Sequence, residues 1–219
     1  MYKIVLTKDG SHTIISPITG DTYHSMGGAI SESHYVYIEN GFLFKQNSLN
    51  YNRDINILEI GFGTGLNCFL TRLNQQNHRI KYTALEPYPL PNQIINNLNY
   101  KEILNKETKF FDLIHKSKIN FEFDYKDEFY FEFINQRLEY YKDDKKFDII
   151  YYDGFAKSKD SKIWGSSNIY KLTNLLTKEG IMVTYASNTY IKKELKSCGF
   201  EYEVLPGALG KREMLRVSW

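Results

Sequence analysis

Three closely spaced glycines give the strongest chemical signal in the sequence, within residues 58–67 (LEIGFGTGLN). Glycines at the end of a strand let a ligand approach the backbone closely, and a helix that follows presents free N–H groups. A dinucleotide site requires the spacing G-x-G-x-x-G, but here Gly61 and Gly63 are followed by Gly65, and Leu66 fills the expected third position. This spacing disfavours a nicotinamide dehydrogenase and indicates a different ligand.

A carboxylate at Glu86 follows the next apolar segment, Ile80 to Leu85. In an open α/β sheet, ligands bind outside the carboxyl ends of the strands, and a carboxylate there accepts two hydrogen bonds from a ribose diol. The alternative is an exposed turn acid before Pro87. Together with the glycine spacing, the sequence favours the ribose role.

A second acid, Asp153, follows the buried segment 147–152 (FDIIYY). At this position it lies on the ligand side of the sheet, where its carboxylate can accept a hydrogen bond or a proton from a ligand. The alternative is a structural aspartate in an Asp-Gly turn, which is common. We interpret Asp153 as the catalytic candidate.

The elements that would position these residues alternate between strands and helices from residue 51 to residue 219. This order predicts a doubly wound, mostly parallel α/β sheet of seven strands, with an antiparallel pair at its C-terminal edge. A strand or hairpin is expected within 121–134, a helix at 90–98, and a helix at 168–177 that Gly180 caps.

The first 50 residues do not follow this alternation. Short apolar runs around Lys8-Asp9-Gly10 predict a hairpin, so a small β-rich extension is expected to pack on the main domain. The segment 32–39 is compatible with either a helix or a strand.

The composition limits the classes of protein that need to be considered. A chain of 219 residues fits one domain, and a net charge of +2 is too small to indicate nucleic-acid binding by itself. The two cysteines, Cys68 and Cys198, lack metal-ligand spacing and suggest buried thiols in a reducing compartment. Because no apolar stretch or signal core is evident, we expect a cytoplasmic protein without a membrane span.

Several segments together resemble the methyltransferase half of the bifunctional bacterial tRNA-modifying MnmC family, which also occurs as a stand-alone enzyme. They are the glycine turn, 22–33 (TYHSMGGAISES), 153–164 (DGFAKSKDSKIW) and 207–215 (GALGKREML). The resemblance implies the class I S-adenosylmethionine methyltransferase fold and N-methylation of 5-aminomethyl-2-thiouridine at the tRNA wobble position. It implies S-adenosyl-L-methionine and the tRNA anticodon loop as ligands, with no metal. Because the flavin-dependent half does not fit in 219 residues, no flavin is expected.

The resemblance also implies roles for individual residues. The expected cofactor contacts are Glu59, Gly61, Gly63, Gly65, Asn67, Glu86, Asn135 and Asp153. The expected substrate contacts are Phe155, Trp164, Lys157, Lys159, Lys211 and Arg212. For the two aromatic residues core packing is an equal alternative, and for the cations a solvated surface position is the alternative.

Two positions depart from the family pattern. Lys157 stands where the family usually has proline, and Asn135 stands where an acid near the adenine is usual. Asn135 can still hydrogen-bond an adenine amino group through its carbonyl oxygen. A methyltransferase for a small molecule or protein, and a non-catalytic nucleotide-binding module, remain open alternatives. The sequence does not define the oligomeric state.

Overall fold

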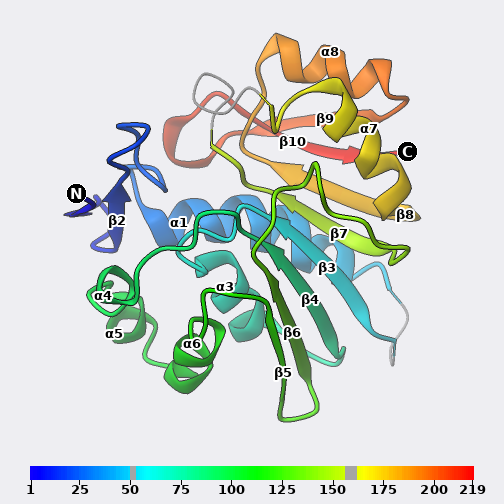
Figure 1. Cartoon of the computed structure of the whole chain (residues 1–219). Coiled ribbons are helices and arrows are strands. Elements are labelled where there is room, and N and C mark those ends of the chain that lie inside the picture. Colours follow the sequence, from blue (N-terminus) through cyan, green and yellow to red (C-terminus); the bar gives the residue numbers. More distant parts are fainter. Residues whose placement is uncertain (50–52, 156–161) are drawn as a thin grey trace.

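The computed structural model describes residues 1–49, 53–155 and 162–219, and shows a central sheet covered by helices on both faces (Figure 1). The eight strands run in the order β5-β6-β4-β3-β7-β8-β10-β9. Their bounds are β3 Ile55–Ile60, β4 Ile80–Leu85, β5 Phe121–Tyr125, β6 Phe129–Ile134, β7 Phe147–Tyr152, β8 Leu176–Thr184, β9 Glu201–Pro206 and β10 Glu213–Ser218. The five strands from β6 to β8 in this order are parallel, which confirms the predicted doubly wound class.

The two edges of the sheet are antiparallel. At the C-terminal edge, β10 pairs with both β8 and β9, as predicted. At the other edge β5 pairs with β6, so the predicted number of seven strands is one too few. The turn between β5 and β6 is tight: Tyr125 pairs with Phe129, and Lys126 and Asp127 in the turn both adopt a positive φ of 56°.

The central strands have apolar residues on both faces, because helices cover each side of the sheet. Successive residues therefore enter different cores: Ile57 and Ile149 pack on one side, whereas Leu58 and Ile150 pack on the other. Most of the aromatic rings fill the first of these cores.

The helices divide between the two faces. One core includes residues of α3 (Leu66–Asn74), α4 (Asn92–Ile95), α5 (Tyr100–Leu104) and α6 (Thr108–Ile114). The opposite core includes α7 (Ser166–Leu175) and α8 (Thr189–Ser197). In the part of the chain that the structure describes, no helix is long and apolar enough to span a bilayer.

The N-terminal residues form a hairpin followed by a continuous helical segment. The hairpin consists of β1 (Lys3–Leu6) and β2 (His12–Ile15), and the helical segment consists of α1 (Ala29–Ser33), the π-helix η1 (His34–Leu43) and α2 (Phe44–Gln46). The segment 32–39, whose sequence is compatible with either a helix or a strand, is therefore helical. Gly41 in η1 packs so closely on the sheet that a Cβ there would lie 2.9 Å from Val183 Cγ2.

Two other boundaries differ from the sequence predictions. Gly180 does not cap a helix, because α7 ends at Leu175 and the chain continues directly into β8. Gly180 lies within β8 where the pairing with β7 shifts, since Phe147 pairs with Leu176 but Ile149 pairs with Ile181. The helix predicted at 90–98 is limited to α4, which begins after Pro91.

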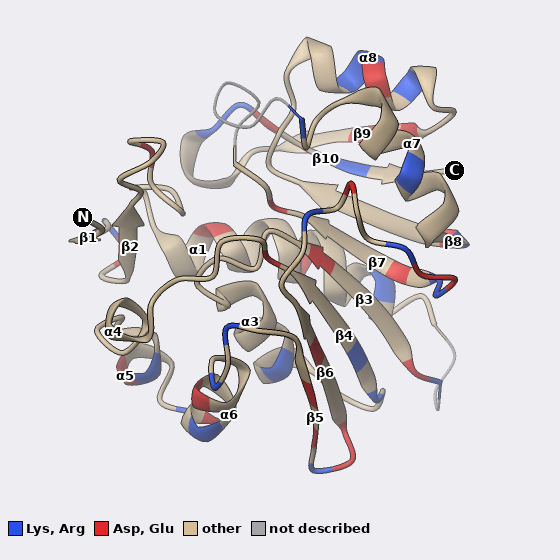
Figure 2. Cartoon of the chain, in the orientation of Figure 1, with Lys and Arg blue, Asp and Glu red and all other residues tan. Residues whose placement is uncertain are grey.

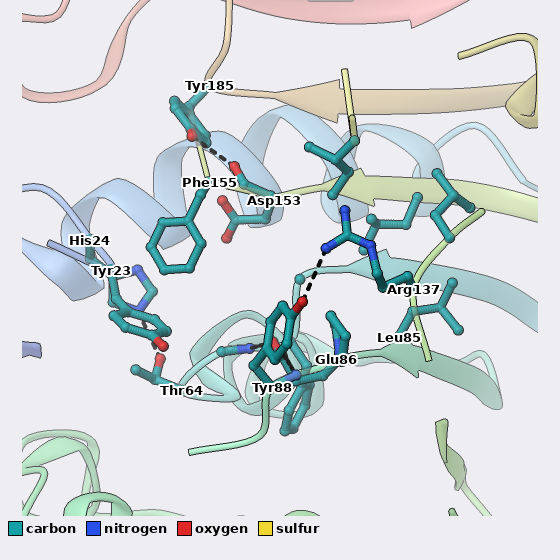
Figure 3. Close-up of a pocket in the computed structure, with 18 of the residues that line it drawn as sticks. Tyr23, His24, Thr64, Leu85, Glu86, Tyr88, Arg137, Asp153, Phe155 and Tyr185 are labelled. Carbon is teal, nitrogen blue, oxygen red and sulfur yellow. Dashed lines mark hydrogen bonds between the residues drawn. The ribbon is translucent and has the colours of Figure 1, made fainter. Parts of the chain in front are cut away.

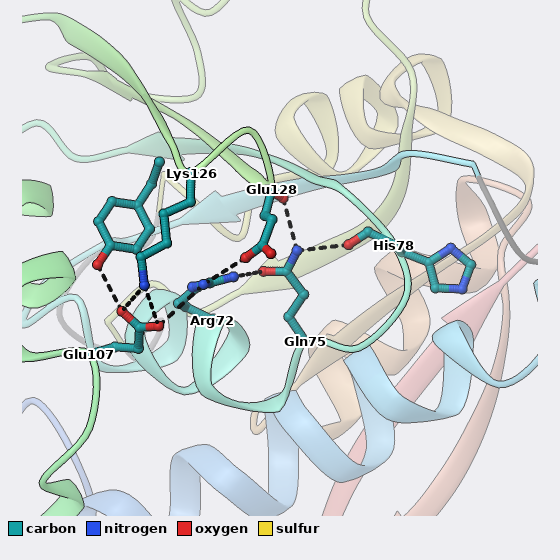
Figure 4. Close-up of polar contacts among 7 residues, drawn as sticks. Arg72, Gln75, His78, Glu107, Lys126 and Glu128 are labelled. Atoms are coloured by element: carbon teal, nitrogen blue, oxygen red, sulfur yellow. Dashed lines mark hydrogen bonds and ion pairs between the residues drawn. The ribbon is translucent and has the colours of Figure 1, made fainter.

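A cluster of polar side chains lies at the end of the sheet where the parallel strands begin (Figure 4). Arg72 of α3 contacts Glu107 at 3.3 Å and Glu128 at 2.8 Å, and Lys126 contacts Glu107 at 3.0 Å. Gln75 donates to the backbone oxygens of His78 and Glu128. These bonds join α3 to the β5–β6 turn, at the opposite end of the sheet from the carboxyl ends of the parallel strands.

Replacing Phe131 by alanine tests the aromatic core. The ring is fully buried and packs against Phe62, Tyr82, Phe121 and Phe123. We expect Phe131→Ala to lower the free energy of unfolding by about 3–5 kcal/mol, because it leaves a cavity. Denaturant titration measures the loss, with the exposed Ile119→Ala as control. Equal, small effects of the two substitutions would contradict this packing.

Candidate active site

A cavity of about 300 Å³ lies at the carboxyl ends of β3, β4 and β7 (Figure 3). Its walls are the loop before α1, the glycine turn after β3, the residues after β4 and β6, and residues 153–155 after β7. Tyr185 and Lys211 complete the wall on the side of β8 and β10. The cavity lies where ligands bind in open α/β sheets, and its size fits a small-molecule ligand.

The glycine turn is shaped by close backbone contacts. Gly61 has a φ of +91°, and a Cβ at this residue would lie 2.4 Å from the carbonyl oxygen of Asp153. Gly63 has a φ of +51°, and its added Cβ would lie 3.2 Å from the ring of Tyr23. Gly61 is therefore required for the chain to turn beside β7, and Gly63 leaves room between the turn and the N-terminal loop. Both residues line the cavity.

Gly65 has a different place in the turn. It is the N-cap residue of α3, with a φ of +71°, and a Cβ there would lie 2.7 Å from His115 Nε2. The residue is not part of the cavity wall. Its glycine character serves the packing behind the turn.

The Glu86 carboxylate is held beside the glycine turn by hydrogen bonds. One carboxylate oxygen accepts a hydrogen bond from the Gly63 N–H at 2.9 Å, and the other accepts one from the Tyr88 N–H at 2.8 Å. Burial raises the pKa of Glu86, and these two hydrogen bonds oppose the increase. The side chain is thus oriented by the backbone on both sides, as Figure 3 shows, and it lines the cavity.

Asn67 connects two buried carboxyl groups behind the cavity. Its amide nitrogen donates to Glu59 Oε1 at 2.9 Å and to Asp153 Oδ2 at 2.8 Å. The other oxygen of Glu59 accepts a hydrogen bond from the Tyr82 hydroxyl. Of these residues only Asp153 lines the cavity, so Glu59 and Asn67 support it from behind.

The environment of these acids changes their pKa values. Burial raises the pKa of Asp153 to about 7, although the hydrogen bond from Asn67 opposes the change. Burial also raises the pKa of Glu59 well above its ordinary value, and the charge of Asp153 adds to this effect. Asp153 therefore exchanges its proton near neutral pH, as a proton acceptor in a catalytic site requires.

Asn135 and Trp164 do not line the cavity. The Asn135 amide donates to the backbone oxygen of Glu86 at 2.8 Å, and Trp164 is buried against Tyr152. The Trp164 indole N–H donates to the Phe155 backbone oxygen at 2.7 Å. Both side chains thus hold backbone that carries residues of the cavity wall.

The remaining predicted substrate residues have different surroundings. Phe155 lines the cavity and meets the Tyr23 ring edge-on, with centroids 5.0 Å apart. Lys211 also lines it, but its ammonium group pairs with Glu32. Arg212 is exposed outside the cavity. Lys157 and Lys159 lie outside the described residues.

Residues for which the sequence predicted no role also lie at the site, among them Tyr23, His24 and Glu32 of the N-terminal segment, which line the cavity. His24 Nε2 lies 2.7 Å from the Thr64 hydroxyl oxygen, and His115 Nε2 lies 3.1 Å from the Thr64 backbone oxygen. Burial lowers the pKa of His24 to about 4 and that of His115 to about 3, so both rings are neutral at neutral pH. Tyr23, His24 and Glu32 fall within the segment 22–33, which is part of the family resemblance. That resemblance was the one sequence feature that could have indicated a role for them.

Comparison with known proteins identifies the class of this site. A family model described as S-adenosyl-L-methionine-dependent methyltransferase matches residues 98–218. The MnmC2 structure from Aquifex aeolicus superimposes with a TM-score of 0.80 at 21% identity, covering 100% of this chain and 70% of that one. Spermidine synthase has a TM-score of 0.54 at 9% identity, with 100% of this chain and 80% of that chain covered. The structural matches define the fold class.

The family follows from the sequence match. The chain belongs to the family of S-adenosyl-L-methionine-dependent methyltransferases. Two relatives carry the name tRNA 5-methylaminomethyl-2-thiouridine biosynthesis bifunctional protein MnmC. That of Burkholderia thailandensis is 26% identical over 97% of this chain, and that of Leptospira interrogans is 28% identical over 98%. The chain spans 34% and 35% of their lengths, so it corresponds to about a third of each relative.

Substitution of Gly61 tests the close contact between the turn and β7. Gly61→Ala introduces a Cβ against the Asp153 carbonyl, whereas Gly10→Ala at a φ of +83° meets no atom within 4 Å. Both variants carry the strain of a positive φ, about 1–2 kcal/mol. We expect Gly61→Ala to be clearly less stable and to bind S-adenosyl-L-homocysteine weakly, by thermal unfolding and calorimetry. Equal stability and binding in the two variants would disprove the contact.

The pKa of Asp153 predicts a dependence of stability on pH. Its value is raised from 3.8 to about 7, so the folded state binds the proton more tightly than the unfolded state, and stability falls as the pH rises between these values. Asp153→Asn removes this titration. From about pH 4 to about pH 8, we expect the unfolding free energy of the variant to rise relative to that of the natural protein, by up to about 4 kcal/mol. Urea titrations at both pH values measure it, and a constant difference would show an ordinary pKa.

Proposed function

We propose that this chain transfers the methyl group of S-adenosyl-L-methionine to the amine of 5-aminomethyl-2-thiouridine at the tRNA wobble position, giving 5-methylaminomethyl-2-thiouridine. The observation that carries the proposal is the juxtaposition of Glu86, the glycine turn and Asp153 around one cavity. The names of the relatives, which refer to biosynthesis of this nucleoside, support the choice of substrate.

The cavity wall fits the cofactor. Each Glu86 oxygen accepts one backbone hydrogen bond and retains a lone pair, so the carboxylate can also accept bonds from the two ribose hydroxyls. Gly61 and Gly63 provide backbone that a ligand can approach without meeting a side chain. Glu59 and Asn67 would act indirectly, by fixing the turn and Asp153.

The bound cofactor supplies a methyl group on a positively charged sulfur. The amine nitrogen would take this methyl group, and the sulfur would leave with the electron pair of the broken sulfur–carbon bond. The amine must first lose a proton to expose its lone pair, because alkylamines are mostly protonated at neutral pH. Asp153 lines the cavity and has a pKa of about 7, so it is suited to accept that proton.

The proposed RNA contacts are next to residues of the cavity wall in the sequence, since Ile163 and Lys211 line the cavity. Arg212 and Lys162 are exposed, and Lys211 is on the same loop as Arg212. Figure 2 shows charges of both signs on many other elements, α8 among them. We infer that these few cations contact the phosphates of the anticodon loop while one base enters the cavity, and that the enzyme works in the cytoplasm.

Transfer of labelled methyl groups to tRNA tests this function. The substrate is tRNA from a strain that accumulates the 5-aminomethyl nucleoside, and nucleoside analysis identifies the product. We expect methylation of that nucleoside, and a loss of turnover of at least about 100-fold in Asp153→Asn, because proton acceptance is lost. Glu203→Gln, a surface acid paired with Arg216, is the control.

Two results would contradict the proposal. One is the absence of product on that tRNA with cofactor bound, and the other is normal turnover in Asp153→Asn. Salt dependence tests the phosphate contacts separately. If these contacts form, tRNA binding should weaken steeply as the salt concentration rises.

A further inference from the structure

The side chains of Glu32, Tyr185 and Lys211 lie together in the cavity wall. The Lys211 ammonium group pairs with the Glu32 carboxylate, and it lies over the Tyr185 ring at 5.3 Å from the centroid. All three residues line the same cavity as Asp153. A carboxylate beside the face of an aromatic ring is a chemically suitable environment for an alkylammonium ion.

The two partners of the ammonium group are held by the backbone. Glu32 is 7% exposed, and its second oxygen accepts a hydrogen bond from the Ser25 N–H at 2.6 Å. The Tyr185 hydroxyl donates to the Gly154 backbone oxygen at 2.8 Å, which fixes the ring beside the residue that follows Asp153 (Figure 3). The site is therefore ordered independently of Lys211.

Lys211 is the exchangeable member of this arrangement. Its side chain is 42% exposed, whereas that of Glu32 is 9% exposed. It lies on the loop that carries η2 (Ala208–Gly210), next to the exposed Arg212. A lysine in this position can turn outward to an RNA phosphate, but the buried Glu32 carboxylate would then lack a counter-ion, which is costly.

We propose that Glu32 and the Tyr185 ring bind the acceptor amine of the substrate as an ammonium ion, and that the Lys211 ammonium group occupies this place until tRNA binds. The inference rests on the proposed function, because it assigns a subsite to the same amine substrate. Exchange of one ammonium ion for another keeps the Glu32 charge compensated. It also couples release of Lys211 toward the RNA to entry of the amine beside Asp153.

The arrangement assigns Glu32 a role in specificity. Uridine without the aminomethyl group offers no cation to replace Lys211. When such a uridine enters the cavity, either Lys211 stays paired with Glu32 or Glu32 is left without a counter-ion. The enzyme should therefore bind amine-bearing tRNA more tightly than otherwise identical tRNA with unmodified uridine. The ratio of the two dissociation constants measures this preference without the contribution of those phosphate contacts that both tRNAs share.

Binding measurements on variants test the subsite, in the presence of S-adenosyl-L-homocysteine so that no reaction occurs. In the natural protein the dissociation constant for unmodified tRNA should exceed that for aminomethyl tRNA. Glu32→Gln should reduce this ratio about tenfold, toward one, because the ammonium loses its charged partner. Lys211→Met should raise the ratio several-fold, because it removes the internal competitor.

The control is Glu213→Gln, which breaks the pair of Lys192 and Glu213 beside the same loop and outside the cavity wall. It should leave the ratio unchanged. A purely structural ion pair would make Lys211→Met and Glu32→Gln lower the ratio alike, and that result overturns the proposal, as does an unchanged ratio in Glu32→Gln. Because the Lys211 side chain is partly exposed, we expect Lys211→Met to fold. This variant therefore still tests the subsite if Glu32→Gln does not fold.

Methyl transfer by the natural protein separates this inference from the proposed function. Transfer to the aminomethyl nucleoside together with a ratio that does not respond to Glu32→Gln removes only the subsite. A natural protein that neither transfers methyl groups nor distinguishes the two tRNAs removes both.

Discussion

The close approach of Gly61 to the Asp153 carbonyl is the constraint on which the site depends. The hypothetical Cβ distance of 2.4 Å means that no other residue fits there without displacing the backbone. Because β3 pairs with both β4 and β7, this contact brings the ends of three parallel strands to one place. The glycine turn, Glu86 and Asp153 then share a cavity, although they are far apart in sequence.

The same geometry determines the electrostatics. Glu59 and Asp153 are held on one amide group of Asn67, so the two acids lie close together, with Glu59 fully buried and Asp153 partly buried. Burial is the main reason why both pKa values rise, and the charge of Asp153 further raises the pKa of Glu59. Asp153 faces the cavity and can exchange its proton, whereas Glu59 serves the packing of the turn. A division of roles between neighbouring acids follows from their different access to the cavity.

The sequence was informative where the signal is local. The glycine spacing and the apolar runs before Glu86 and Asp153 depend on neighbouring residues, and the doubly wound class follows from their alternation. It was less informative where partners come from distant segments. The pair of Lys211 and Glu32 joins residues at opposite ends of the chain, so the sequence predicted Lys211 as a substrate contact and did not indicate Glu32 as its partner. The contacts of Trp164 and Asn135 with backbone oxygens are likewise invisible in the sequence, because no local pattern indicates them, and their predicted ligand contacts stay predictions.

Boundaries failed for a related reason. Gly180 follows a helical pattern, but pairing with β7 extends the strand back to Leu176 and overrides the local capping preference. Likewise, the segment 32–39 is apolar enough for either a strand or a helix, and packing on the sheet determines that it is helical.

The central claim is that this cavity binds the cofactor S-adenosyl-L-methionine. The ribose of the cofactor binds Glu86, and the backbone of the glycine turn contacts the rest of the cofactor. A crystal structure of the chain with S-adenosyl-L-homocysteine tests it most directly. We expect the two ribose hydroxyl groups to donate to the Glu86 carboxylate, with the sulfur on the side of Asp153. A ligand bound elsewhere, or a Glu86 side chain turned away from the sugar, would contradict the account.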